Sequence, residues 1–374
     1  MKKFSSILIA FVFLVSCKSA AQDKKNPEKD MQTKTHSKVT DWNKFIVSKD
    51  DAWFGTEEAQ KIADNVLLYQ RDIGGWPKNI QMQNKLSDDE IDQLIKLKSD
   101  PIGCTADNGA TCQEMVFLSK IYGHFPDLKY KNAFLKGLSY LLSSQYKNGG
   151  WPQFFPLKKG YPTHITFNDD LMVNILKILK EIKVNAKFNS IEIPNDLYNY
   201  SVLAFDKGIS CIIETQYVQN GVLTAWCAQH DEFTLKPANA RAFELASLSG
   251  IESAKITQLL MSIDNPSEAV IKSVDAAYNW FESTKIVGYK IVSVPIESDK
   301  TDKMLVESAD AEPIWARFME LDTNKPFFCD RDGIKKYAMS EIGYERRNGY
   351  KWYGSEPKAV LKKYSSWKEK VSAK

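Results

Sequence analysis

The order of apolar and polar residues follows a helical period over most of the chain. Apolar side chains recur at spacings of three and four residues, as expected for amphipathic helices. An alternating strand pattern occurs at residues 286–294, with a weaker one at 304–306. We therefore expect a mainly α-helical fold with a small strand-containing portion. The predicted helices cover residues 57–69, 88–97, 110–122, 129–142, 169–182, 196–215, 238–248 and 267–281.

Two local motifs predict where helices begin and end. Thr111 precedes Glu114 by three residues, which is the spacing of a capping box. Gly250 follows the predicted helix over residues 238–248, and a glycine in this position commonly ends a helix. On this interpretation Arg241 lies in the first turn of that helix.

A weak internal repeat indicates stacked helical hairpins. The motif GGWP begins at Gly74 and recurs at Gly149, 75 residues later, and a looser copy ends at Trp226. Each copy follows a predicted helix that ends in a glutamine beside a tyrosine. Repeats of this length are typical of stacked helix pairs, as in an α/α toroid. We expect the tryptophans to pack each turn onto its neighbour.

The N-terminal residues have the pattern of an export signal. Lys2 and Lys3 precede a short apolar run, and the sequence Leu-Val-Ser-Cys ends it at Cys17. Such a run is too short to span a bilayer as a helix. The pattern resembles a bacterial lipobox, which predicts a lipoprotein signal peptide over residues 1–16 and lipidation of Cys17. A plain signal peptide cut near Ala20 is the alternative.

The polar, lysine-rich residues 17–40 are predicted to form a flexible tether. With Cys17 lipidated, the protein is expected in the cell envelope, held to the outer membrane by its lipid alone and facing the periplasm or the cell surface. We expect a monomer.

Charge alone says little about partners, because the formal net charge is only +3. The choice of cation is more informative, since nearly all the basic residues are lysines. Arginine is the side chain suited to planar, bidentate recognition of carboxylates or phosphates. Surface ion pairs are the ordinary alternative, in particular for the last two arginines. No basic patch with interleaved aromatics predicts nucleic-acid binding. The arginines are Arg71, Arg241, Arg317, Arg331, Arg346 and Arg347.

The cysteine count leaves disulfide pairing open. Five cysteines follow Cys17, so at least one of them is unpaired within the chain. No CxxC spacing occurs, which argues against a zinc cluster. These cysteines are Cys104, Cys112, Cys211, Cys227 and Cys329.

Two short motifs place oxygen-bearing side chains just before predicted helices. Asp107 and Asn108 form the first, and a single Asp or Asn in such a position is more often a helix cap. The second is Asn168-Asp169-Asp170. Three such residues in a row leave more oxygen donors than a cap needs, which favours a calcium site.

Three arginines lie within polar and aromatic motifs. Arg317 and Arg331 are fourteen residues apart, which is compatible with a pair of carboxylate clamps or with a salt-bridged loop. For Arg241 the alternative is an exposed ion pair with Glu244 or Asp231.

Six stretches together make the chain similar to the pectate lyases of polysaccharide lyase family 10. The motif GGWP is weak by itself, whereas six stretches in the family's order are specific. The resemblance covers roughly Asp41 to the C-terminus. The stretches are 74–79 (GGWPKN), 107–118 (DNGATCQEMVFL), 148–156 (NGGWPQFFP), 164–171 (HITFNDDL), 223–253 (LTAWCAQHDEFTLKPANARAFELASLSGIES) and 313–354, which includes ARFMELDTNKPFFCDRDGIKKY and ERRNGYKWYG.

The resemblance implies that residues 41–374 form a pectate lyase catalytic region. The implied fold is an (α/α) toroid-like helical barrel with a smaller mixed portion that contains short strands. The implied activity is cleavage of α-1,4-polygalacturonate by calcium-dependent β-elimination, which gives 4,5-unsaturated oligogalacturonides.

The resemblance also implies the roles of six residues. Arg241 matches the catalytic base, and the calcium-side carboxylates match Asp107 and Asp169. The residues that match binders of substrate carboxylates are Asn108, Arg317 and Arg331. An arginine is ordinarily protonated, so a base role requires a lowered pKa or a concerted proton transfer. An alkaline optimum is the expected consequence.

Two alternatives differ in their chemistry. A uronyl glycoside hydrolase on an α/α toroid would use two carboxylates and no calcium. A non-catalytic pectin-binding lipoprotein would stack Trp and Tyr rings on sugars and would release no unsaturated product.

Overall fold

The computed structural model describes residues 41–373. The predicted signal peptide, the tether and the lipidation site Cys17 lie outside the described residues. Within the described part, no helix combines the length and the apolar character needed to cross a membrane.

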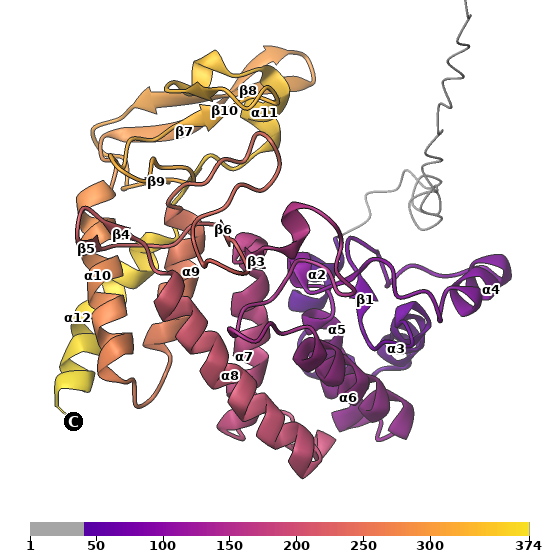
Figure 1. Ribbon diagram of the computed structural model, residues 1–374. Helices are drawn as coiled ribbons and strands as arrows, with labels where there is room; N and C mark the ends of the chain where they lie inside the picture. The colour runs from indigo at the N-terminus through magenta and orange to yellow at the C-terminus, as the bar shows by residue number, and fades with distance from the viewer. Residues whose placement is uncertain (1–40, 374) are drawn as a thin grey trace, which may run out of the picture. The chain divides into compact units, whose positions relative to one another are not determined.

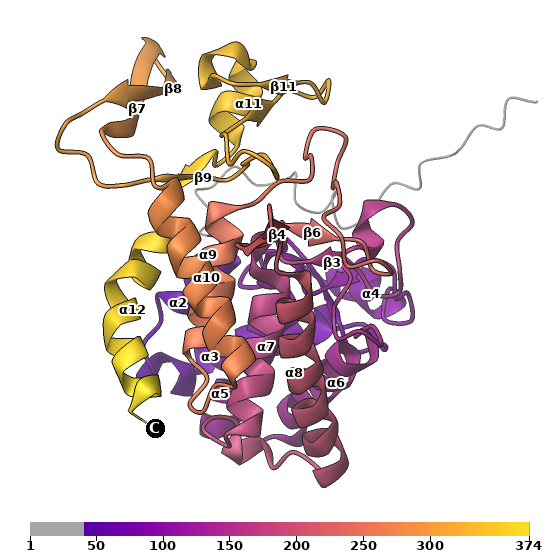
Figure 2. The same cartoon turned by 60° about the vertical axis from the view of Figure 1, so that its left-hand side comes forward.

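The described chain is mainly α-helical and toroid-like, as predicted. Helices α5 and α6 pack together, as do α7 with α8 and α9 with α10, and α12 packs on α9 and α10 (Figures 1 and 2). The α-helices are α2 (Trp42–Val47), α3 (Glu57–Tyr69), α4 (Asp88–Lys96), α5 (Cys112–His124), α6 (Leu128–Ser143), α7 (Leu171–Lys183), α8 (Asn195–Thr215), α9 (Gly250–Met261), α10 (Glu268–Thr284), α11 (Tyr344–Gly349) and α12 (Pro357–Ser372).

Short 3₁₀ turns join several helices. They are η2 (Ala52–Gly55), η3 (Asp107–Gly109), η4 (Tyr161–Thr163), η5 (Asn168–Asp170), η6 (Asn189–Ile191) and η7 (Met339–Glu341).

The strands of the described chain pair two by two, and every pair is antiparallel. The longest pair is the hairpin of β7 (Tyr289–Glu297) and β8 (Lys300–Glu307), which overlaps the predicted strand over 286–294 from Tyr289 onward and contains the weaker one at 304–306. The short pairs are β1 (Trp76–Pro77) with β2 (Cys104–Thr105), β3 (Ile165–Thr166) with β6 (Gln229–His230), β4 (Val218–Gln219) with β5 (Val222–Leu223), β9 (Trp315–Ala316) with β12 (Tyr353–Gly354), and β10 (Phe328–Cys329) with β11 (Lys335–Lys336).

The tryptophans of the internal repeat are packing residues, as predicted. Trp76, Trp151 and Trp226 are almost fully buried. Each indole nitrogen donates a hydrogen bond to a backbone carbonyl of the preceding helix of the repeat, which satisfies its one polar atom. The acceptors are Val66, Leu141 and Ile212, at 2.8, 2.8 and 2.7 Å.

The glutamines of the repeat connect successive helices. Gln70, Gln145 and Gln216 each follow a helix and donate to one carbonyl in the adjoining turn and to another in a later helix. The later acceptors are Ala133 in α6, Ala204 in α8 and Ser273 in α10. The turn acceptors are Gly74, Gly149 and Thr224. The repeat therefore links α3, α6, α8 and α10 in series by the same two side-chain hydrogen bonds at each step.

The helix predicted over residues 238–248 does not form. This segment is an irregular loop, and Arg241 lies in it rather than in a helix. Leu248 bridges to both Cys227 and Met319, and Asn239 accepts a hydrogen bond from the Ala246 amide at 2.7 Å. The apolar side chains that suggested a helical face pack in two places instead: Leu245 against an aromatic cluster, and Leu248 in the main core.

Two predicted helix boundaries are also wrong. Gly250 begins α9 instead of ending a helix, because the Ser249 hydroxyl caps that helix by accepting from the Glu252 amide. Thr111 makes no capping bond to α5. Its hydroxyl donates to the Thr105 carbonyl and accepts from the Trp76 amide, so it serves the turn before the helix.

The core has two parts. The larger lies among the helices, and the smaller is an aromatic cluster under the C-terminal loops. The cysteines of the described chain are buried, and no disulfide forms among them. The smaller cluster comprises Phe318, Phe327, Phe328, Met339, Ile342 and Trp352.

Candidate functional site

The two predicted metal-side carboxylates lie on adjacent turns. Asp107 begins η3 and Asp169 is in η5, and these two turns pack against each other. Each turn contains a residue in the left-handed region, Asn108 with φ 53° and Asp169 with φ 52°. Asp and Asn tolerate this conformation better than other side chains. The residue types at these positions are therefore set partly by the backbone of the turns.

Asp107 is fully buried and has one unused oxygen. Its Oδ2 accepts from Gln153 Nε2 at 2.7 Å and forms a short ion pair with Lys78. Its Oδ1 is buried without a hydrogen-bond partner. A buried carboxylate oxygen that lacks a partner is costly. A hard cation held by this oxygen would satisfy it, so the donor chemistry at Asp107 fits a metal such as calcium.

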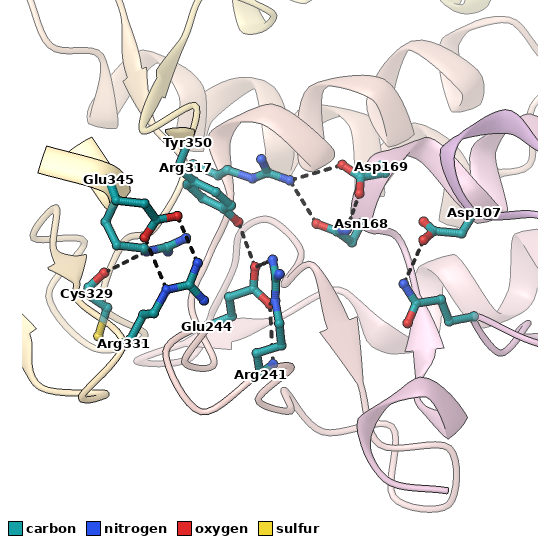
Figure 3. Close-up of polar contacts among 12 residues, drawn as sticks. Asp107, Asn168, Asp169, Arg241, Glu244, Arg317, Cys329, Arg331, Glu345 and Tyr350 are labelled. Atoms are coloured by element: carbon teal, nitrogen blue, oxygen red, sulfur yellow. Dashed lines mark hydrogen bonds and ion pairs between the residues drawn. The ribbon is translucent and has the colours of Figure 1, made fainter. Parts of the chain in front are cut away.

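Asp169 lies between an amide and an arginine. Its Oδ2 accepts from Asn168 at 2.7 Å, and its Oδ1 is 3.5 Å from Arg317 Nη2 (Figure 3). Burial raises the pKa of the Asp169 carboxyl, and the charge of Arg317 opposes this effect. The carboxylate is still 42% exposed, so a ligand can reach it.

Arg317 links this region to the aromatic cluster. Its Nη2 donates to Asn168 Oδ1 at 2.8 Å and to Glu252 Oε1 at 2.6 Å. Its guanidinium also lies over the Tyr350 ring, 4.8 Å from the centroid. Arg317 is buried, and its position is therefore set by α9 on one side and by an aromatic ring on the other.

Arg241 is held by a bidentate ion pair. Its Nε and Nη2 donate to the two oxygens of Glu244, at 2.7 and 2.5 Å. The hydrogen bonds that Arg241 donates to Glu244 raise the pKa of Arg241 above its ordinary value. The expected lowering of this pKa is thus not found in this state, because a carboxylate stabilises the charged guanidinium.

Tyr350 connects the two arginines. The Tyr350 hydroxyl donates a hydrogen bond to Glu244 Oε1 at 3.3 Å, and the Arg317 guanidinium stacks on the Tyr350 ring. Asp169, Arg317, Tyr350, Glu244 and Arg241 therefore form one continuous series of contacts, which Figure 3 shows.

The other two predicted binders lie at separate points. Arg331 is exposed and pairs with Glu345 through two bonds of 3.1 and 2.8 Å. Its guanidinium also stacks on the Phe243 ring, two residues from Arg241 in the chain. Asn108 donates to Asn79 Oδ1 at 3.1 Å and is next to the buried Asp107.

Sequence reasoning missed several residues that hold the site together. Glu252, Tyr350, Phe243, Gln153 and Lys78 each contact one of the predicted site residues. One of them had a sequence signal: Glu252 follows Ser249 by three residues, which is capping-box spacing before an apolar run. The others lack any such local signal.

A second group of ligand-type residues lies elsewhere. Among residues 41–373, ligand atoms of His164, Asp231 and Glu232 lie within 4.8 Å of one another. His164 Nδ1 and Glu232 Oε2 are hydrogen-bonded at 2.9 Å, and Asp231 accepts from the Thr234 amide and hydroxyl. The group is therefore internally satisfied, unlike Asp107.

The site combines carboxylates with arginines that can bind acidic sugars, on a toroid-like helical fold. This combination is what an enzyme acting on a polyuronate requires. The family model of pectic acid lyases matches residues 70–361. The chain belongs to this family, and it is a lyase with pectate lyase activity.

Solved structures agree with the family match. A family 10 polysaccharide lyase from Cellvibrio cellulosa is 35% identical, covers 85% of this chain and 95% of its own, and has a TM-score of 0.72. A mutant of a family 10 lyase from the same organism, in complex with trigalacturonic acid, is also 35% identical. It covers 84% of this chain and 96% of its own, with a TM-score of 0.72. Among curated protein sequences no match is found.

Proposed function

We propose that this enzyme cleaves α-1,4-polygalacturonate by calcium-assisted β-elimination and releases 4,5-unsaturated oligogalacturonides. The observation that carries the proposal is the series of contacts from Asp169 through Arg317, Tyr350 and Glu244 to Arg241. It links a carboxylate suited to a metal with guanidinium groups suited to a uronate. The trigalacturonic acid bound to the related lyase supports this choice of substrate.

The reaction requires one proton transfer and one bond cleavage. A base removes H5, the C5–H electron pair forms the C4–C5 double bond, and the C4–O4 pair leaves with O4, which takes a proton from water. The acidity of H5 depends on how well charge is stabilised on the adjacent carboxylate. Arg317 and Arg331 are the candidates for binding substrate carboxylates, and Asn108 is the candidate amide.

Asp107 and Asp169 are the residues that would hold calcium. The unpartnered Oδ1 of Asp107 and the accessible carboxylate of Asp169 support this assignment. When bound, calcium supplies a Lewis acid that draws charge from the uronate carboxylate. Lys78 already places a cation against the other Asp107 oxygen, so its charge adds to the electropositive character of this side.

Arg241 is the proposed base, and its pair with Glu244 must loosen before it can accept a proton. An incoming uronate carboxylate competes for the same guanidinium and is the natural trigger for this release. Neutral arginine is rare at ordinary pH. The rate is therefore expected to rise toward alkaline pH.

Attachment to the outer membrane by a lipid on Cys17 is part of the proposal, on the evidence of the sequence before that residue. Metabolic labelling with a radioactive fatty acid would test it. Labelling of the full chain and loss of label in Cys17→Ser are expected, and a full chain that takes up no label would contradict it.

The first experiment measures ultraviolet absorbance of the unsaturated product on polygalacturonate, with calcium and then with excess chelator. We expect a rise that the chelator abolishes, and loss of the rise in Asp169→Ala. Asp206→Asn is the control, since Asp206 lies in α8, forms an exposed ion pair with Lys183 and is none of the proposed calcium ligands. New reducing ends without unsaturated product would instead mean hydrolysis. Chelator-resistant elimination would remove calcium from the proposal.

A further inference from the structure

Three arginine side chains converge on one aromatic ring. The Cζ atoms of Arg241, Arg331 and Arg346 lie 4.9, 5.0 and 4.7 Å from the centroid of Phe243. Phe243 itself is almost completely buried in the loop that carries Arg241. Two of these arginines are predicted site residues, whereas a surface ion pair was the alternative left open for Arg346.

Arg346 is buried and lacks a counter-ion. Arg346 is 5% exposed. Its Cζ atom also lies 4.5 and 5.0 Å from the ring centroids of Tyr350 and Trp352. Its Nε donates to the Cys329 carbonyl at 3.2 Å, and its Nη2 is buried without a partner. Among residues 41–373 no carboxylate forms an ion pair with it. Burial lowers the pKa of Arg346 accordingly.

The neighbouring residue shows what a structural arginine looks like here. Arg347 pairs with both oxygens of Asp302, at 2.7 and 2.6 Å, and its pKa is raised by that carboxylate. Arg346 contacts aromatic faces and one carbonyl, and the charges of Glu244 and Glu345 reach it without forming an ion pair with it. A buried arginine without a carboxylate is costly to keep, so its charge is expected to serve another group.

The charges that face Arg241 come from several elements. Glu244 is its direct ion-pair partner, and the phenol groups of Tyr161 and Tyr350 raise the pKa of Arg241 by a smaller amount. Glu345 is also near, but it is exposed and already paired with Arg331. Within the described chain, Arg346 is the buried cation that faces Arg241 without an ion pair of its own, and the positive charges of Arg346 and Arg241 disfavour each other.

The Arg346 charge is close enough to Arg241 to influence its protonation. Because both guanidiniums lie within 5 Å of the same centroid, they are no more than about 10 Å apart, which is the Debye length near 0.1 M salt. Screening is weaker still for a buried group. A like charge at this range disfavours the charged form of its neighbour.

We propose that Arg346 is a positioning residue for Arg241, whose buried positive charge favours the neutral form of the Arg241 guanidine that accepts H5. Phe243 holds the two groups in register. The inference rests on the proposed function, in which Arg241 is the base. It predicts an effect on turnover and on pH dependence rather than on substrate affinity, because Arg346 is too buried to meet the polymer.

The test compares Arg346→Met, which removes the charge, with Arg346→Lys, which keeps it, and uses Arg347→Met as the control. For Arg346→Met we expect kcat to fall about tenfold at fixed pH and the pH–rate profile to move about one unit to higher pH. Arg346→Lys should recover kcat to within roughly threefold of wild type, with KM unchanged. Arg347→Met should leave the pH–rate profile in place.

Three outcomes would overturn the inference. One is an unchanged Arg346→Met enzyme. Another is equal impairment in the Met and Lys variants with matching losses of melting temperature, which would mean packing alone. The third is a raised KM with unchanged kcat, which would make Arg346 a substrate binder. If the Met variant does not fold, Arg346→Gln against Arg346→Lys makes the same comparison.

Failure of the proposed function gives a different pattern. A wild-type enzyme without unsaturated product, or an Arg241→Lys variant as active as wild type at every pH, removes Arg241 as the base. If substitution of Arg241 abolishes activity while Arg346→Met leaves kcat and the pH–rate profile unchanged, only the inference about Arg346 fails.

Discussion

The Arg317 guanidinium and the Glu252 carboxylate lie 2.6 Å apart, both buried, although 65 residues separate them in the chain. Glu252 is in the first turn of α9, where Ser249 caps the helix, and Arg317 follows β9. This pair fixes the arginine that contacts Asn168 and Asp169. The position of one predicted substrate binder is therefore set by a helix that contributes none of the predicted site residues.

Removing the partner of this buried arginine should be costly. We expect Glu252→Gln to lower the free energy of unfolding by about 3–5 kcal/mol, because it removes the buried counter-ion of Arg317 and leaves, among the described carboxylates, only the longer contact with the more exposed Asp169. Chemical denaturation measures it. Glu57→Gln is the control, since Glu57 and Lys61 form an exposed pair whose loss should leave the midpoint unchanged. Equal small effects in both variants would show that Glu252 does not hold Arg317.

The Glu244 carboxylate is expected to set the pH dependence of turnover. It keeps Arg241 charged, so its removal lowers the pKa of Arg241 and makes the neutral form available at lower pH. For Glu244→Gln we expect the pH–rate profile to move to lower pH by about one unit or more. Glu345→Gln, which loses an exposed pair with Arg331, should move it less. A shift of the Glu244→Gln profile to higher pH would contradict this account.

Gly208 in α8 is expected to be required for close packing of the repeat. A Cβ at this position would lie 2.5 Å from Leu176 Cδ2 and 3.0 Å from the Trp151 ring. We expect Gly208→Ala to destabilise the protein by about 1–3 kcal/mol through overpacking. Gly123 in α5 meets nothing within 4 Å, so Gly123→Ala should stabilise by up to about 1 kcal/mol. Thermal unfolding of the two variants should show opposite signs, and the same sign in both would refute the packing argument.

Glu114 is expected to make stability depend on pH. Burial raises the pKa of this carboxyl to about 7, although the side chains of Gln113 and Trp42 donate hydrogen bonds to it. The folded state therefore keeps a proton that the unfolded state loses, so stability falls as pH rises from the ordinary carboxyl range to about 7.

Glu114→Gln mimics the protonated form at every pH. Its stability relative to wild type should be about 2–3 kcal/mol greater at about pH 8 than at about pH 5. Denaturation midpoints at the two pH values measure the difference. A constant difference between the two proteins would mean that Glu114 titrates normally in the folded state.

The sequence by itself determined the helical architecture, because helix formation here follows a local period. Helix α3 begins and ends at the predicted residues, and the GGWP repeat correctly predicted buried tryptophans that pack turn onto helix. The family was also predictable, since six motifs in order are specific even where each alone is weak.

Only the tertiary structure decided how the site residues meet. The loop around Arg241 has helical periodicity, yet its apolar residues pack on partners brought from residues 318–353, so the distant contacts override the local pattern. The same holds for Glu252 with Arg317 and for Arg346 on Phe243, whose pairing depends on segments far apart in the chain. Local propensity is encoded within a few neighbouring residues, whereas ion pairs and ring stacking are formed only when the whole core closes.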